Sequence, residues 1–520
     1  MKPFPGRLPI FLLLFALTSL RSIAAAEKPV VNVILWFDTE DYLLPADDDA
    51  TKRLAEMLTR RGIRATFKIV GEKARVLEQR GRRDVIAALK KHDIGYHANY
   101  HSVHPAPSEY LADCGLLDGI AEFARREGGG AADVRRILGV KTLACYGQPG
   151  SSWASQTLAA LQEIGVAPHG VACYVDEGTH IGLNEQPFWY ANALVVYHMG
   201  QNYTRMDLHD PAAVEPAKRK ASGIADRLRD QGGGLISIFY HPCEWVHKEF
   251  WDGVNFRRGA NPPREQWKPP PQRPAEETEA AFSRFAEYID HIRSIPGVHF
   301  VTATDLPELY PDPVRTQGAD KEDLDELVKR LVLPGVAGVN FQMVGDRAYS
   351  PADQFEALAA AMGQILAGQK VRFPIPLPGL LGPDGAPPPG REQTRLEKFA
   401  FRDATRDVVD FIRKQRRVPA RVFIGADAVP PVDFLVALAR AYEAHGRNLE
   451  AVGELGRNVE VLTTRNVAKD TPELFGGWII HKEGFRAPKI LEIARLQAWT
   501  LKPATPRRSA TSGKAGGLNR

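Results

Sequence analysis

The sequence predicts an α/β protein whose parallel sheet closes, or nearly closes, into a barrel, followed by a mainly helical C-terminal repeat domain. Two observations carry this prediction. From residue 30 to about 310, short continuous apolar stretches alternate with helical ones, which is typical of buried parallel strands joined by helices. Beyond residue 320, this alternation gives way to similar segments in which a proline opens an amphipathic helix.

Length and composition indicate a globular protein of more than one domain. The chain has 520 residues, of which 44% are hydrophobic and 25% charged. The formal net charge of +4 is small for this length, so charge alone gives no reason to expect a nucleic-acid partner.

The first 26 residues have the pattern of a secretory signal peptide. Lys2 and Arg7 precede the apolar run 9–20, and three alanines follow at 24–26. The run is short for a membrane span, and no later segment is predicted to be transmembrane. We therefore expect an exported protein, periplasmic, wall-associated or extracellular, whose mature chain begins near Glu27. The four cysteines form no CxxC pair, which argues against a structural zinc site and leaves disulfides and free thiols both open.

The barrel elements follow from the apolar periodicity. The first strand, 30–37, is a continuous apolar run that ends in acidic residues. The further strands are expected at 65–70, 94–97, 141–147, 169–175, 191–198, 234–240 and 298–303. The helices are expected at 50–61, 74–92, 108–127, 155–164, 215–230 and 276–293. A Pro-rich stretch at 261–274 predicts a long surface loop, either lining a site or merely tolerated.

A break in this pattern at 311–320 indicates a domain boundary. The predicted domains are a barrel over 27–312, a helical repeat domain over 320–504 and a disordered basic tail over 505–520. The repeat copies are 344–355 and 424–434, each with the helix that follows, and a degenerate third copy at 480–499. Such units are expected to stack, because none buries its apolar face alone.

Residues typical of a metal-dependent hydrolase follow three of the predicted strands. Carboxylates come after the first strand, two histidines after 94–97 and one histidine after 234–240; they are Asp38, Glu40, Asp41, His97, His101 and His241. The carboxyl ends of parallel strands gather distant residues at one edge. The i, i+4 histidines are expected on one face of a helical turn, with His104 as an alternative partner for His101. Each piece alone has an ordinary structural interpretation; together they predict hydrolysis on a divalent metal.

These segments resemble a known family. The order of Trp36-Phe-Asp38, Ala65-Thr-Phe-Lys-Ile-Val-Gly-Glu72, Asp93-Ile-Gly-Tyr-His-Ala-Asn-Tyr-His101 and Ile238-Phe-Tyr-His241 is similar to the polysaccharide deacetylases. These are the NodB-type homology domain, or carbohydrate esterase family 4. The resemblance covers roughly residues 30–308. It implies a distorted (β/α) barrel, a divalent metal that is usually zinc, and removal of acetyl groups from an N-acetylated polysaccharide or cell-wall glycan.

The resemblance also implies roles for individual residues. Asp38 corresponds to the catalytic base, His97 and His101 to metal ligands, and His241 to the general acid. Asp176 stands where the family has an aspartate that orients the catalytic partners.

Two departures from the family pattern affect the expected site. Thr39 follows Asp38 where the family has a second aspartate, so the metal carboxylate is expected to be Glu40 or, as the alternative, Asp41. In the third motif Gln148 replaces the arginine that tethers the base, so the base is tuned differently or the site is inactive. Gln148 is then expected on the substrate side, with Trp153 and Tyr240 as further substrate contacts.

Two other functions stay open on the sequence alone. One is an inactive deacetylase-like protein that binds glycan, with C-terminal repeats that faintly resemble pseudomurein-binding repeats. The other is a metal amidohydrolase acting on a small amide, as in allantoinase-like relatives of the fold.

Overall fold

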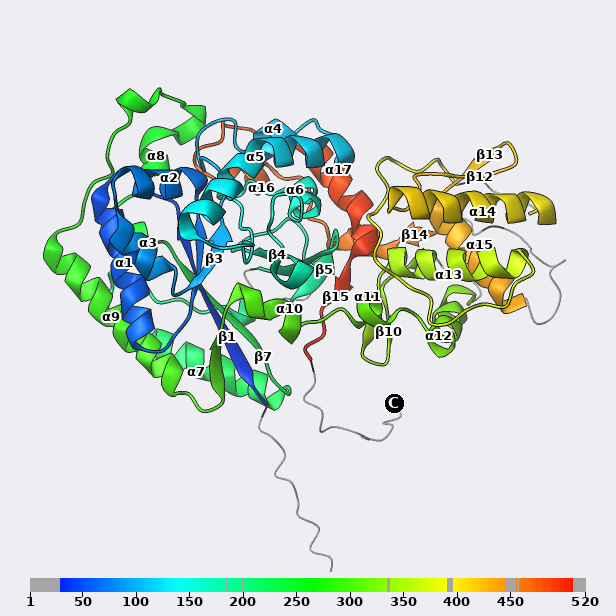
Figure 1. The fold of residues 1–520 in the computed structure, drawn as a ribbon, viewed down its shortest axis with the longest axis horizontal. Coiled ribbons are helices and arrows are strands. Elements are labelled where there is room, and N and C mark those ends of the chain that lie inside the picture. The colour runs from blue at the N-terminus through cyan, green and yellow to red at the C-terminus, as the bar shows by residue number, and fades with distance from the viewer. Residues whose placement is uncertain are drawn as a thin grey trace, which may run out of the picture.

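The computed structural model has two lobes, a larger barrel lobe and a smaller helical lobe (Figure 1). It describes residues 29–183, 186–197, 200–333, 337–390, 396–444, 455 and 458–507. The predicted signal peptide and residues 508–520 of the predicted tail lie outside the described residues. Within the described ranges, no helix combines the length and apolarity needed to cross a membrane.

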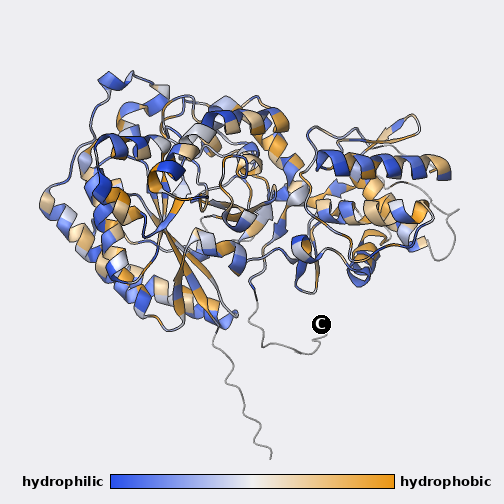
Figure 2. Ribbon diagram, in the orientation of Figure 1, coloured by the Kyte–Doolittle hydropathy of each residue, from blue (hydrophilic) through white to orange (hydrophobic). Residues whose placement is uncertain are grey.

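The centre of the barrel lobe is strand β1 (Val31–Thr39), which is almost entirely buried. Parallel strands β2 (Thr66–Ile69) and β3 (Asp93–Tyr96) continue the sheet on one side, and β7 (Gly234–Tyr240) lies on the other. Strand β8 (Val298–Val301) pairs with the first half of β1. These strands are largely apolar along their length (Figure 2), as burial on both faces requires.

A second group of strands continues the barrel. It consists of β4 (Ala172–Val175), β6 (Ala193–Val196), β5 (Phe188–Tyr190) and β15 (Lys502–Pro503). Single parallel bridges from Tyr96 to Tyr146 and from Tyr146 to Tyr174 join the two groups. The strand expected at 141–147 is therefore present only as isolated bridges, and the predicted distorted (β/α) barrel is confirmed.

Helices pack around these strands, and two predicted helices are split. The stretch 74–92 forms two helices because Gly81, at φ 66°, ends the first, and the stretch 108–127 also divides. The helices of this lobe are α1 (Pro45–Arg60), α2 (Gly71–Gln79), α3 (Arg83–Leu89), α4 (Pro107–Leu111), α5 (Leu116–Leu138), α6 (Ser155–Ala160), α7 (Val214–Asp230), α8 (Trp251–Asn255), α9 (Ala275–Ser294) and α10 (Leu306–Leu309). In the Pro-rich loop, Trp267 packs against Tyr42 and Trp251. All four cysteines are unpaired.

The helical lobe contains two copies of one unit. After α11 (Pro313–Gln317), the first copy is α12 (Lys321–Leu331), the hairpin β10 (Gln342–Val344) and β11 (Arg347–Tyr349), and α13 (Pro351–Leu366). The second copy is α14 (Lys398–Gln415), the hairpin β12 (Val422–Ile424) and β13 (Asp427–Val429), and α15 (Pro431–Ala444). Helix α13 packs against both α14 and α15, so the copies share one core, as their sequence predicts.

The predicted third copy, 480–499, does not extend this layer. Its helix α17 (Pro488–Gln497) packs against α6, and its apolar residues belong to the barrel core. Strand β15 then pairs with β5 in the barrel. The predicted repeat domain 320–504 is therefore too long at its C-terminal end, because the apolar face of α17 is covered by the barrel rather than by another repeat.

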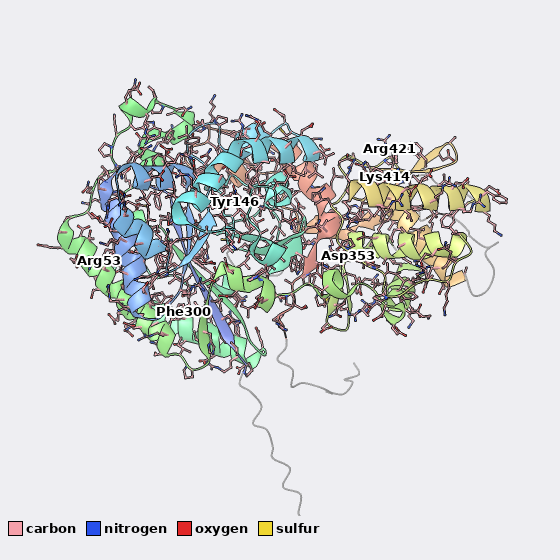
Figure 3. All side chains as sticks on the ribbon, viewed as in Figure 1. Arg53, Tyr146, Phe300, Asp353, Lys414 and Arg421 are labelled. Atoms are coloured by element: carbon pink, nitrogen blue, oxygen red, sulfur yellow. The ribbon has the colours of Figure 1, made fainter. Side chains whose placement is uncertain are left out.

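A buried charge cluster fastens the two lobes together. Lys502 Nζ lies 2.7 Å from Asp312 and 2.9 Å from Asp353, and Arg315 pairs with Asp353 at 2.5 Å. Figure 3 shows Asp353 at the junction between the lobes. Because each buried charge has a partner of opposite sign, the cluster supports a defined junction.

Candidate active site

Glu40, His97 and His101 converge at one edge of the barrel. Glu40 Oε2 lies 2.9 Å from His101 Nε2 and 3.4 Å from His97 Nε2, and all three residues are buried. The loop that carries the histidines is not the helical turn we expected, because Ala98 and His101 adopt positive φ values of 64° and 60°. It still brings the two imidazoles within 5.0 Å between ring centres. One carboxylate and two imidazoles, with donor atoms within 4.8 Å of one another, form a group that could hold a divalent metal.

The surroundings of the two histidines fix which ring nitrogen faces Glu40. His97 Nδ1 donates to the Gly147 carbonyl at 2.9 Å. His101 Nδ1 lies 2.5 Å from Ser102 Oγ, and this hydroxyl donates to Asp252 at 3.4 Å. Both Nε2 atoms are therefore free to offer a lone pair, and His101 Nε2 is buried with no hydrogen-bond partner. A buried acceptor of this kind beside a carboxylate fits a cation between them.

Two alternatives for the metal ligands fit less well. Asp41 is turned away, since Oδ1 accepts from the Leu43 amide and Oδ2 lies 2.9 Å from His247 Nδ1. A second acidic group consists of Asp38, His97 and Asp176. Its two carboxylates share a lysine, and His97 Nδ1 is already bonded to a carbonyl.

That lysine, Lys68, is the charge partner of Asp38, and we did not predict it. Its Nζ lies 2.8 Å from Asp38 Oδ1 and 3.3 Å from Asp176 Oδ2, and it donates to the Val175 carbonyl at 2.8 Å. The Trp36 ring lies 4.0 Å from the ammonium. Burial lowers the pKa of Lys68, but the charges of the two aspartates outweigh this and raise the pKa above its usual value. Lys68 is therefore a permanent cation beside the base.

Two glycines in neighbouring segments make room for this lysine. A Cβ at Gly147 would lie 2.0 Å from Lys68 Nζ, and a Cβ at Gly95 would lie 2.9 Å from Lys68 Cγ. The sequence feature that could have indicated this ion pair is a lysine within the buried strand β2. Such a charge requires a buried counter-charge, which we could have sought among the aspartates at the strand ends.

Asp176 acts on the site through Lys68. Its Oδ1 accepts from the Gly178 amide at 3.2 Å, and its Oδ2 faces the lysine. Burial raises the pKa of Asp176 to about 7, although Lys68 opposes the shift. Asp176 therefore contacts the ammonium that lies beside Asp38, and its orienting role stays a prediction.

His241 is oriented instead by Glu244. The Nδ1 of His241 donates to Glu244 Oε1 at 2.8 Å, and Glu244 also pairs with Arg205. Nε2 points to the other side and lies 3.7 Å from Asp38 Oδ2. Burial lowers the pKa of His241, but the hydrogen bond to Glu244 and the charges of Glu40 and Asp38 raise it to about 10. This histidine is thus protonated at neutral pH.

These groups open into a cavity of about 370 Å³. Its lining includes Asp38, the three candidate ligands, His241 and Gln148. Part of the wall comes from the distant segment that carries Trp478 and Ile479. Sequence reasoning missed this wall, because nothing in that segment belongs to the family motifs.

Two predicted substrate contacts do not reach the cavity. Trp153 is fully buried and packs against Tyr190 and His180. The Tyr240 hydroxyl is bonded to the backbone of Met206. Adjacent residues on a strand face opposite sides, so Tyr240 points into the core where His241 points into the site. Neither side chain lines the cavity where we predicted substrate contacts.

Comparisons with known proteins found solved structures that are similar to about half of the chain. No family model and no curated protein matches the sequence. Among solved structures, one described as a polysaccharide deacetylase from Mycobacterium smegmatis is 13% identical and has a TM-score of 0.34, covering 55% of this chain and 92% of its own. The carbohydrate esterase domain of a multidomain xylanase from the hindgut metagenome of Trinervitermes trinervoides is 13% identical, with a TM-score of 0.27, and covers 54% and 90%. A family 4 carbohydrate esterase from Streptomyces lividans in complex with acetate is 15% identical, with a TM-score of 0.27, and covers 52% and 91%.

These structures fall in carbohydrate esterase family 4, the family that the motifs of this chain resemble, and they cover about half of it.

Proposed function

We propose that the protein is a metal-dependent hydrolase that removes acetyl groups from an N-acetylated polysaccharide or cell-wall glycan. The observation that carries the proposal is the pairing of a base and an acid beside a metal-type ligand group. Asp38 and His241 are 3.7 Å apart, and Glu40, His97 and His101 lie in the same cavity. Two nitrogen donors and one carboxylate suit zinc, which we propose as the metal.

The residues of the chain divide the reaction between them. A divalent metal held by Glu40, His97 and His101 would supply Lewis-acid polarisation of the acetyl carbonyl and a more acidic water. Asp38 then accepts the proton of the water that attacks the acetyl carbon. His241, whose protonated form is favoured by the hydrogen bond to Glu244, gives its Nε2 proton to the leaving nitrogen as the C–N bond breaks. The products are acetate and a sugar with a free amine.

Lys68 supports the role of Asp38 as a base. The loss of the motif arginine at Gln148 was the reason to consider an inactive protein. A fully buried ammonium at 2.8 Å provides the missing positive charge from a different strand. This ammonium is a buried positive charge in contact with the carboxylate that we propose as the base.

The test is acetate release from N-acetylglucosamine oligomers together with the metal content of the purified protein. We expect about one divalent metal per chain, and loss of about 10³-fold in kcat for Asp38→Asn with the metal retained. Asp41→Asn is the matched control, since Asp41 points away from the cavity. Metal-free protein that releases no acetate yet binds wall polymer would replace this proposal with the glycan-binding one. Turnover of small amides alone would favour the amidohydrolase.

We also propose that the protein is exported through its N-terminal signal-type segment. The apolar run 9–20 and the alanines that follow it support this proposal. The mass of the protein recovered outside the cytoplasm should correspond to a chain that begins near Glu27. Recovery of the intact 520-residue chain from the cytoplasm would contradict export.

A further inference from the structure

A second cavity of about 530 Å³, which we call the second lobe of the cleft, adjoins the active-site cavity at Trp478. Four residues line both lobes: Gln148, Gly150, Glu177 and Trp478. The second lobe is otherwise lined by Ser151, Gly178, Thr179, His180, Thr471, Glu473, Leu474 and Gly477. Half of this second set comes from the C-terminal segment around helix α16 (Pro472–Gly476), which returns to the barrel lobe (Figure 1). The cleft is thus built jointly by the barrel and by residues almost 300 positions further along the chain.

Trp478 is held firmly as the divider between the two lobes. Its Nε1 donates to Asp252 at 3.1 Å, the same carboxylate that accepts from Ser102 behind His101. Its ring stands edge-on to His101 with 5.5 Å between ring centres. A Cβ at Gly150 would lie 2.2 Å from the indole, so the glycine and the tryptophan fit only each other. An aromatic ring fixed beside a metal-type site offers a surface against which a sugar can pack.

The backbone around this divider is tied to the barrel on both sides. Ser151 Oγ donates to the Phe475 carbonyl at 2.7 Å. The amides of Arg258 and Gly259 donate to the carbonyls of Ile479 and Ile480 at 2.9 and 2.7 Å. The segment is therefore a built part of the cleft and not a loosely attached extension.

The charged side chains of the cleft select against anionic ligands. The formally charged residues that line the second lobe are two carboxylates, Glu177 and Glu473. In the first lobe the carboxylates, which include Glu249 and Asp252, outnumber the two cations Arg257 and His241. A sugar that carries its own carboxylate would be repelled there, whereas a neutral sugar or an amine-bearing sugar would not.

We infer that the second lobe is a subsite for the sugar next to the one that is deacetylated, and that this neighbour carries no carboxylate. The substrate is then an oligomer or polymer of neutral or amino sugars that passes Trp478. This inference rests on the proposed deacetylation and specifies its substrate class. Contacts to the neighbouring sugar would raise kcat/KM for oligomers over the monosaccharide.

The experiment fills the second lobe and leaves the first one intact. Gly178 lines only the second lobe, and a Cβ placed on it meets open space, so Gly178→Phe projects a ring into that lobe. The control is Gly223→Phe on helix α7, an exposed glycine whose added Cβ also meets open space. Acetate release is measured for N-acetylglucosamine, for its trimer, and for an oligomer in which the neighbouring sugar bears a carboxylate.

We expect kcat/KM for the trimer to exceed that for the monosaccharide by about tenfold or more, which corresponds to about 1.4 kcal/mol. Gly178→Phe should abolish this gain, Gly223→Phe should keep it, and the carboxylate oligomer should show none. Trp478→Ala should also reduce the trimer-to-monomer ratio, with its metal content measured separately. Equal kcat/KM for trimer and monomer, or an unchanged ratio in Gly178→Phe, would overturn the subsite while leaving deacetylation intact. Absence of acetate from every substrate would instead refute the proposed function itself.

Discussion

Two buried lysines, five positions apart, give the molecule two similar charge clusters with different uses. Lys68 and Lys73 are both fully buried, and each one pairs with two aspartates. Lys73 Nζ lies 2.5 Å from Asp47 and 2.6 Å from Asp48, and it donates to the Asp41 carbonyl at 2.7 Å. Each ammonium therefore has three oxygen neighbours for its three protons.

The difference lies in where the carboxylates face. Asp47 and Asp48 lie in the first turn of α1, where negative charge stabilises a helix, and Asp48 is also held by Arg80 at 2.8 Å. Neither lines the active-site cavity, whereas Asp38 does and turns its second oxygen toward His241. The two clusters therefore differ in that only the Lys68 cluster presents a carboxylate to the cavity, as the proposed role of Asp38 requires.

Replacing the two lysines in turn is the strongest test of this comparison. We expect Lys68→Met to lower kcat for acetate release by about 100-fold, because the buried Asp38 then loses its positively charged partner. Lys73→Met should change kcat per folded molecule by less than about tenfold, because its aspartates lie outside the cavity. Equal losses in the two variants, measured on protein of matched folded fraction, would show that both clusters merely hold the fold together.

A second variant tests whether Lys68 acts through its positive charge alone. Gln148 stands where the related family has its arginine, and it lines the cavity. Gln148→Arg placed in the Lys68→Met background should recover at least about tenfold in kcat, because a positive charge returns to the cavity that Asp38 lines. The same Gln148→Arg change in the wild-type background is the control. No recovery, with the metal still bound, would mean that Lys68 acts by more than its charge.

The sequence predicted those parts of the site that repeat a local pattern. Asp38, Glu40, His97, His101 and His241 each end or follow a recognisable strand, so their meeting at one edge followed from parallel topology. The order of elements in the barrel and the two repeat copies were predicted for the same reason. Their boundaries moved where a single glycine, such as Gly81, ended a helix inside an apolar pattern.

The parts that the sequence did not predict depend on contacts between distant segments. In the sequence, Lys68 is a charged residue within a strand that is expected to be buried. Only the fold shows that Gly95 and Gly147 lie against its side chain and leave room for it. Trp478 lies just before the predicted third copy, and contacts with distant barrel residues such as Ser151 and Asp252 hold its segment at the cavity. Trp153 was assigned to the cavity by its place in a motif, although its ring is buried among Tyr190 and His180. Side-chain direction is decided by tertiary packing, which no local pattern reports.

We expect the two clusters to contribute similarly to the free energy of unfolding, although they differ in their expected effect on activity. Removing one partner of a buried ion pair leaves an uncompensated charge, so Lys68→Met and Lys73→Met should each lower the free energy of unfolding by about 3–5 kcal/mol. Lys52→Met is the control, because Lys52 pairs with Asp84 at the surface and should cost about 1 kcal/mol or less. Denaturant unfolding at pH 7 measures all three. A loss below 1 kcal/mol for Lys73→Met alone would mean that Arg80 can hold those aspartates without it.

The smallest expected effect concerns His241, the proposed general acid, whose Nε2 faces Asp38. The hydrogen bond to Glu244, together with the charges of Glu40, Glu244 and Asp38, raises the pKa of His241 to about 10 against the opposing effect of burial. The proposed general acid must be protonated to act. Activity should therefore fall as pH rises through the pKa of His241, and Glu244→Gln should move this decline to lower pH by about one unit or more. The measurement is kcat/KM against pH for both proteins. Glu215→Gln, on the surface of α7, is the matched control and should leave the profile unchanged. If the basic limb stayed in place in Glu244→Gln while activity at low pH fell, His241 would not be the group that donates the proton.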